Sequence, residues 1–167
     1  MEFPEPTHPY ADRREVLLEY LDFYRGVLRA KVIGLDDDAL RTSRLPSGWA
    51  PIELIKHLVH VERRWLVWGF EGEDVGDPWA DERDDRWFVA AHEQLEDLLD
   101  ELDAGGRRTR EIVHSHELSD IGAPGDRWRG EPPASLERVL LHLMQEYARH
   151  AGQLDVVREL IDETTGE

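Results

Sequence analysis

Apolar residues recur at intervals of three and four along four long segments of the chain, and no convincing two-residue alternation is present. This period predicts amphipathic α-helices with one apolar face each. The predicted helices cover residues 12–32, 51–69, 85–115 and 133–162. Four such helices predict an all-α fold, an antiparallel four-helix bundle with long inter-helix loops, one of them long enough to cross the bundle.

Capping and breaking residues support these boundaries. Asp12 has a side chain suited to an N-cap, Gly34 ends the first helix, and Pro51 suits the first position of the second. The pair Gly105-Gly106 interrupts the third segment, but the apolar period resumes about one turn later. The pattern therefore favours one long third helix that continues through the two glycines.

The connections are long for bundle turns, especially residues 35–50, 71–84 and 117–132. Long connections in a compact domain often form lids or binding walls, so these segments are expected to frame a pocket at one end. The length of 167 residues predicts one domain, residues 1–167.

Composition narrows the classes of function. The chain has no cysteine, which excludes disulfides, thiolate metal sites and a cysteine nucleophile, so a small molecule must bring any thiol. The net charge of −17 argues against a nucleic-acid partner, because phosphate binding needs a positive surface. No apolar run approaches a membrane span and no secretion signal is recognisable, so we expect no membrane partner and a cytoplasmic location.

Polar residues interrupt the predicted core at three places. Glu146 and His150 lie on the apolar stripe of the fourth helix, and their spacing of four places both side chains on one face. His57 lies on the apolar stripe of the second helix. Burying these groups without partners is costly. The pattern indicates a divalent metal ion bound by His57, Glu146 and His150 with an open coordination position, which is typical of catalytic sites.

Other interpretations of these residues stay open at this stage. A histidine on a core face is often a hydrogen-bonded core residue, and Glu146 could pair with an arginine as a buried ion pair. His142 and His60 could extend or replace the set, although surface positions or contacts behind the ligands suit both better. Glu62 or His60 is a further candidate for such supporting contacts, which orient metal ligands.

Two segments resemble a known superfamily. The second and fourth helices of the DinB/YfiT-like superfamily are similar to residues 48–65, GWAPIELIKHLVHVERRW, and residues 135–155, SLERVLLHLMQEYARHAGQLD. Together with residues 158–162, RELID, they resemble the uncharacterised DUF664 branch. The resemblance spans nearly the whole chain, and the two motifs are specific as a pair.

This resemblance implies a four-helix bundle that holds a metal, commonly zinc or nickel, on three residues. The usual set is three histidines. Here the middle place is Glu146, as in mycothiol-dependent maleylpyruvate isomerase, with His57 matching the first ligand and His150 the last. Members of known activity are often transferases or isomerases that use mycothiol, bacillithiol or glutathione. The resemblance therefore implies a small-molecule substrate, a low-molecular-weight thiol and a homodimer.

Two hypotheses of function follow. The first is a divalent-metal-dependent enzyme, a thiol-dependent S-transferase or isomerase acting on a small electrophile. The alternative is a non-catalytic, stress-related or small-molecule-binding bundle, in which the buried polar trio is structural.

Overall fold

Four long helices dominate the computed structural model, which describes Pro4, Pro6, Thr7 and residues 12–166. They are α1 (Arg13–Val32), α3 (Pro51–Glu62) with its π-helical continuation η1 (Arg63–Phe70), α4 (Leu95–Ser115) and α5 (Leu136–Asp162). The short elements are α2 (Asp37–Arg41), the strands β1 (Glu82–Arg83) and β2 (Arg86–Trp87), and the 3-10 helix η2 (Asp126–Trp128). The predicted all-α fold is confirmed.

The helices α1 and α3 begin where Asp12 and Pro51 predict. The Asp12 carboxylate accepts a hydrogen bond from the Arg14 backbone N–H at 2.9 Å, so Asp12 is the N-cap of α1. Pro51 is the first residue of α3, and Ser135 caps α5. These contacts satisfy backbone N–H groups that have no partner within their own helix.

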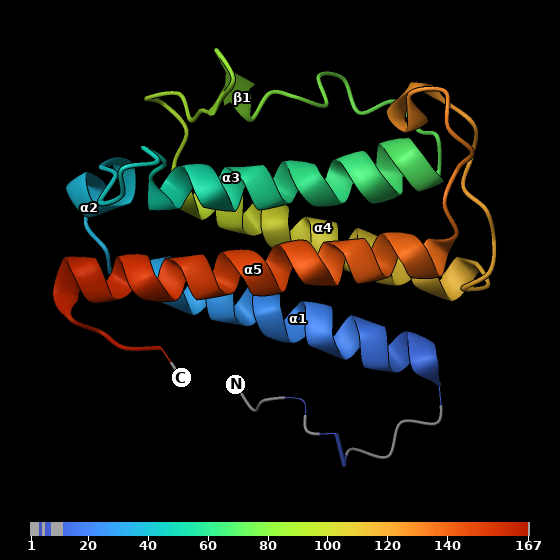
Figure 1. Ribbon diagram of the computed structural model, residues 1–167, viewed down its shortest axis with the longest axis horizontal. Helices are drawn as coiled ribbons and strands as arrows, with labels where there is room; N and C mark the ends of the chain where they lie inside the picture. Colours follow the sequence, from blue (N-terminus) through green and yellow to red (C-terminus); the bar gives the residue numbers. More distant parts are fainter. Residues whose placement is uncertain (1–3, 5, 8–11, 167) are drawn as a thin grey trace.

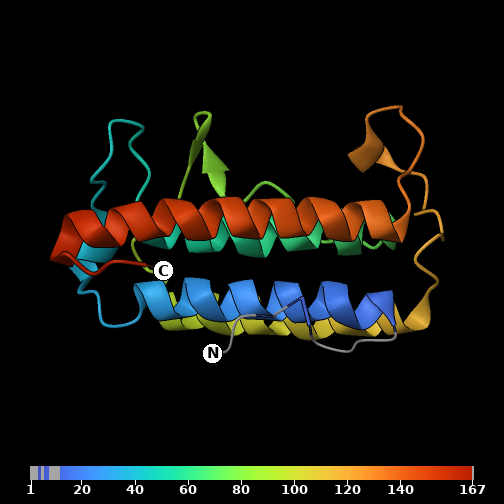
Figure 2. The same cartoon turned by 60° about the horizontal axis from the view of Figure 1, so that its bottom comes forward.

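The four helices form two layers, with α3 and α5 in one and α1 and α4 in the other (Figure 2). α1 packs against α4 and α5, and α3 packs against the same two helices. Figure 1 shows that α1 and α5 run in one direction and that α3 and α4 run in the other. The neighbours α3 and α4 are therefore parallel, because residues 71–94 return along the bundle as the predicted crossing connection.

The predicted start of the third helix near Asp85 is wrong, since α4 begins at Leu95. Asp84 and Asp85 have φ of 53° and 59° and form the turn between β1 and β2. Phe88 is spaced from Leu95 as in a helix, but the two residues do not share a helix. The Phe88 ring packs under the Arg83 guanidinium, whose Cζ lies 3.5 Å from the ring centroid. The crossing segment thus reaches ten residues further than the apolar period indicates.

A core of aliphatic side chains lies between the layers. Its least exposed members come from all four long helices and include Leu21, Leu28, Ile55, Leu58, Leu102, Ile112, Leu143 and Leu154. Burial of this apolar surface is the main force that holds the bundle together. Among the described residues, no helix has both the length and the apolar character that a membrane span requires.

Candidate metal centre

The three predicted ligands come together between α3 and α5. His57 lies on α3, and Glu146 and His150 lie one turn apart on α5. Each residue offers one potential ligand atom, and these three atoms all lie within 4.8 Å of one another. The Glu146 Oε2 atom lies 3.2 Å from His150 Nε2, and the two imidazole rings are 5.2 Å apart between centroids. The structure therefore places these side chains as the sequence pattern predicts.

Hydrogen bonds fix the orientation of both imidazoles. His57 Nδ1 lies 3.0 Å from Asp81 Oδ2, and His150 Nδ1 lies 2.8 Å from Gln153 Oε1. A carboxylate and an amide oxygen only accept, so each Nδ1 carries the proton and donates. Each Nε2 then keeps its lone pair, as a histidine that ligates a metal through Nε2 requires.

Asp81 is the residue behind His57. It is fully buried and also accepts hydrogen bonds from Arg64 Nη1 at 2.5 Å and Nη2 at 3.1 Å. Burial raises the pKa of the Asp81 carboxyl, but the hydrogen bonds from His57 and Arg64 outweigh it and lower the pKa to about 2. The carboxylate is thus ionised beneath His57, and the crossing segment of residues 71–94 supplies it.

Sequence reasoning missed Asp81 as a functional residue. It carries no periodic signal, because it follows Trp79 in an irregular segment and owes its position to contacts far along the chain. The length of this connection was the one feature that could have indicated a functional residue, since long connections often form the walls of binding sites.

Trp87 forms an aromatic wall over the same histidines. Its ring stacks on His57 with centroids 4.2 Å apart and planes inclined by 23°, and it meets His150 edge to face at 5.4 Å. Trp65 packs against His142 at 4.5 Å. Trp87 therefore limits the access of solvent to His57 on the side that faces the crossing segment.

The neighbouring histidines do not join the three-residue set. His142 Nε2 lies 3.4 Å from Glu146 Oε1 on the far side of that carboxylate. His60 Nδ1 lies 3.9 Å from Asp81 Oδ1, beyond hydrogen-bond distance, and is a buried atom without a partner. Burial lowers the pKa of His60 although Asp81 opposes it, so the imidazole is held neutral.

Glu62 belongs to a separate buried network, so the suggestion that it supports the ligands is wrong. Its carboxylate accepts from Arg25 Nη2, from Thr109 Oγ1 and, at 2.8 Å, from the Tyr147 hydroxyl. All four residues are at most 5% exposed. The network links α3 to α1, α4 and α5 through charge-assisted hydrogen bonds.

The glycine pair of α4 provides the space for this network. A Cβ at Gly106 would lie 2.9 Å from Arg25 Nε, and a Cβ at Gly105 would lie 3.2 Å from Glu62 Oε2. The prediction that α4 continues through both glycines is confirmed. The reason for the glycines is steric, because side chains from two other helices lie closer to both positions than is usual for a Cβ atom.

The network also bears on the alternative reading of Glu146. Within the described chain, Glu146 has ion-pair contacts with His142 and His150 and none with an arginine. The buried arginine–glutamate pair that the alternative anticipated is formed by Arg25 and Glu62 instead. The carboxylate of Glu146 therefore still lacks a permanent positive partner.

The donor set suits a divalent cation. Two imidazole nitrogens and one carboxylate oxygen are ordinary ligands of zinc, and ligands of a tetrahedral zinc ion lie about 3.3 Å apart at bond lengths of about 2.0–2.2 Å. The Glu146–His150 separation of 3.2 Å already has this value. The side chains of His57, Glu146 and His150 are 13%, 23% and 6% exposed, so one side of the group faces solvent. The group could therefore bind a metal and leave a position for a small molecule.

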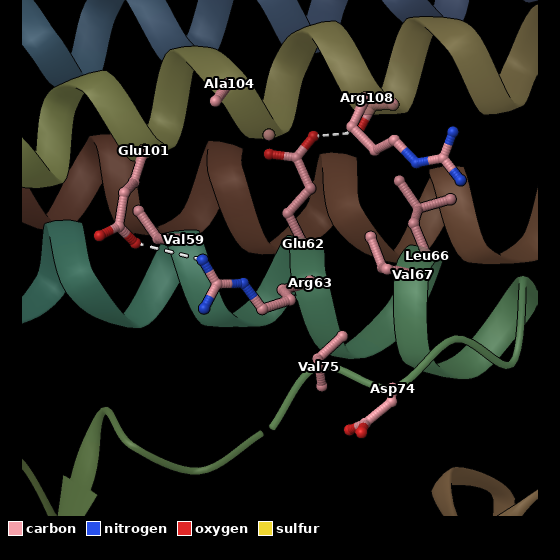
Figure 3. Close-up of a pocket in the computed structure, with 12 residues that line it drawn as sticks. Val59, Glu62, Arg63, Leu66, Val67, Asp74, Val75, Glu101, Ala104 and Arg108 are labelled. Carbon is pink, nitrogen blue, oxygen red and sulfur yellow. Dashed lines mark hydrogen bonds and ion pairs between the residues drawn. The ribbon is translucent and has the colours of Figure 1, made fainter. Parts of the chain in front are cut away.

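A cleft of about 440 Å³ lies elsewhere, between α3 with η1 and α4 (Figure 3). Glu62 points from α3 toward α4 in this cleft, and Arg63 ion-pairs with Glu101 at 3.2 Å. Arg108 is held by Glu73 at 2.7 Å. These charges have partners and the cleft contains none of the three candidate ligands, so it is distinct from the candidate metal centre.

Comparison with known proteins places the chain in a family. A family model described as mycothiol-S-transferase matches residues 16–163. The chain belongs to this family, which is DinB/YfiT-like, and membership indicates a thiol S-transferase-like function. None of the curated proteins matches the chain.

A solved structure supports the fold. The crystal structure of a conserved protein from Enterococcus faecalis is 17% identical, with a TM-score of 0.67, over 93% of this chain and 100% of that one. At this identity the likeness concerns the fold alone.

Proposed function

We propose that the protein is a metal-dependent S-transferase or isomerase that joins a low-molecular-weight thiol to a small electrophilic substrate. The observation that carries the proposal is the convergence of His57, Glu146 and His150, with each imidazole already oriented through Nδ1 and each Nε2 free to ligate. Membership in the mycothiol-S-transferase family supports the thiol as the co-substrate.

Zinc is the metal we propose, and nickel is the alternative. Zinc accepts two imidazoles and one carboxylate in a four-coordinate site and leaves the fourth position to a small molecule. When bound, the divalent ion supplies a Lewis acid that favours the thiolate form of a thiol near neutral pH.

The chain's own residues prepare this position. Asp81 accepts a hydrogen bond from the Nδ1–H of His57 and is itself held in an ion pair by Arg64, so the ring cannot rotate without breaking its hydrogen bond to a buried, fixed carboxylate. Gln153 holds His150 in the same manner from one turn along α5. Trp87 covers the His57 ring and keeps water from that side. Such support of ligands from behind commonly changes metal affinity by about tenfold to a hundredfold.

The reaction class follows from the thiol. The thiol gives up its proton to solvent water, a sulfur lone pair forms the new bond to an electrophilic carbon, and the leaving group departs with the electron pair of the bond that breaks. In an isomerase, the same sulfur adds to a conjugated carbon–carbon double bond and leaves after rotation about that bond. No cysteine of the chain competes as nucleophile, because the chain has none.

Metal content provides the test. Purified protein loaded with zinc and freed of excess ion is expected to retain one metal per chain, and His57→Ala and His150→Ala are expected to lose it. His92→Ala is the matched control, because His92 lies in an exposed turn outside the centre. Full retention of zinc by the two ligand variants, or no retention by the wild type, would contradict the proposal.

The non-catalytic alternative has one observation in its favour. The Glu62–Arg25 network shows that this bundle does bury structural polar groups without a metal. That network satisfies its own charges, however, whereas the trio presents three acceptors and no fixed cation. A small-molecule substrate and a homodimer stay predictions of the family resemblance.

A further inference from the structure

Arg127 lies in the connection between α4 and α5, within η2, which sits beside η1 in Figure 1. Its guanidinium stacks on Trp65, with Cζ 3.5 Å from the ring centroid, and lies 6.0 Å from the Trp79 ring. The Nε atom is buried and has no hydrogen-bond acceptor among the described residues. The side chain is thus fixed by aromatic contacts while its polar edge is unused.

The absence of a carboxylate partner sets Arg127 apart. Every other arginine of the described chain that is buried or half-buried forms an ion pair with Asp or Glu. Arg127 has none, although Asp and Glu outnumber Lys and Arg by 37 to 20. Burial, reinforced by the charges of Arg64 and Arg129, lowers its pKa to about 10. A half-buried cation amid other cations calls for an anion that the chain does not supply.

Stacking alone does not satisfy this group. A cation–π contact uses the face of the guanidinium, whereas its N–H groups lie in the plane and point away from the ring. Those in-plane donors match the two oxygens of a carboxylate in a bidentate pair. Trp65 therefore fixes the plane of the guanidinium, and its in-plane N–H groups have no acceptor among the described residues.

Two chains of contacts connect Arg127 with the candidate metal centre. Trp65, under the guanidinium, packs on His142, whose Nε2 lies 3.4 Å from the Glu146 carboxylate. By the second route, Trp79 lies 4.4 Å from the guanidinium of Arg64, which ion-pairs with the carboxylate that holds His57. Arg127 and the candidate metal centre are therefore connected by continuous side-chain contacts.

We infer that Arg127 binds a carboxylate of the molecule held at the candidate metal centre, so that the site selects anionic small molecules. This inference rests on the proposed function. The carboxylate belongs either to the thiol or to the electrophile, and the chemistry of recognition is the same for both. Arg127 is then a binding residue, and Trp65 positions it.

A ladder of thiols tests the inference in protein loaded with cobalt(II), whose thiolate-to-metal absorption reports binding. The probes are unbranched ω-mercapto acids of increasing length, each paired with its neutral amide. At one length, the acid is expected to bind about tenfold or more tightly than its amide, as a charge-assisted bidentate pair implies. Arg127→Gln is expected to abolish this preference and Arg127→Lys to reduce it.

The matched control is Arg129→Gln, which removes the same charge from an exposed position two residues away and should keep the preference. An unchanged cobalt spectrum in Arg127→Gln without thiol verifies that the centre is intact. The inference is overturned if no acid is preferred at any length, or if Arg127→Gln and Arg129→Gln lose the preference equally.

A second arm uses sulfur-free acids, such as hexanoate with hexanamide as its control, followed by calorimetry on the same proteins. Binding of hexanoate that needs Arg127 and persists beside a bound neutral thiol assigns the carboxylate to the electrophile. Acid preference confined to the thiols assigns it to the thiol. If neither the acid nor the amide thiols bind the metal, the proposed function fails. In that case, hexanoate binding that depends on Arg127 would still support the inference, and hexanoate binding that does not depend on Arg127 would overturn it.

Discussion

Replacing Gly106 with alanine separates local helix propensity from tertiary packing, because the two predict opposite signs. Within a helix, Gly→Ala normally raises the free energy of unfolding by about 0.5–1 kcal/mol. At Gly106 the added Cβ would lie 2.9 Å from Arg25 Nε and 3.0 Å from its Cζ. Arg25 is 5% exposed and tied to Glu62, so it can retreat only by disturbing that ion pair.

The magnitude follows from these terms. Overpacking of a close-packed interior costs about 1–3 kcal/mol, which exceeds the gain in propensity. We expect Gly106→Ala to lower the free energy of unfolding by about 1–2 kcal/mol, and the melting temperature by roughly 2–8 °C for a chain of this size. Gly152→Ala is the matched control, since Gly152 is exposed on α5 and a Cβ there meets nothing within 4 Å. It should stabilise the protein by about 0.5–1 kcal/mol.

Urea unfolding followed by far-UV circular dichroism measures both variants. A Gly106→Ala protein as stable as the wild type, beside a stabilised Gly152→Ala protein, would refute the packing argument. It would show that Arg25 moves aside without loss, and that the glycine is not needed to accommodate the network.

Three further predictions concern the candidate metal centre and its surroundings. Removal of bound metal by a chelator should lower the melting temperature of the wild type by about 5–10 °C, because a ligand that binds only the native state stabilises that state. The melting temperature of His57→Ala should not change. Equal melting curves of the wild type with and without chelator would favour the non-catalytic bundle. Asp81→Asn should weaken zinc affinity by about tenfold to a hundredfold in competition with a chromophoric chelator, since His57 loses its ionised partner; unchanged affinity would show that Asp81 does not support the ligand. Burial lowers the pKa of His60, so below the unfolded value of about 6.5 the unfolded chain takes up a proton that the folded chain resists, and stability falls as the pH drops. The slope of stability against pH in metal-free protein should be shallower in His60→Gln, and equal slopes would exclude His60 as its source.

The sequence predicts the features that depend on neighbours along one helix. The spacing of Glu146 and His150 determines that both face the same way, because an α-helix places residues four apart one above the other. Gln153, which holds the His150 ring, lies within one turn of it and belongs to the same local pattern. Their convergence with His57 follows from burying the apolar stripes of two helices against each other.

The start of α4 and the contacts of residues 71–94 could not be predicted from helical spacing. Helical spacing extends by chance from Phe88 to Leu95, yet the chain turns at Asp84 and Asp85 and crosses the bundle. The period of apolar residues reports a local face, and an irregular segment has no such face to read. Its position depends on partners far along the chain.

By itself, then, the sequence determined four amphipathic helices and the common face of the candidate ligands, since both follow from the repeat of the α-helix. Only the tertiary structure decided that Asp81 lies behind His57, that Trp87 covers it, and that Arg127 stacks on Trp65 without a carboxylate. It also explained the glycines of α4, since Glu62 of α3 lies close to Gly105 and Arg25 of α1 lies close to Gly106. These contacts join segments distant in sequence, and their geometry is set by how the whole chain packs rather than by any local repeat.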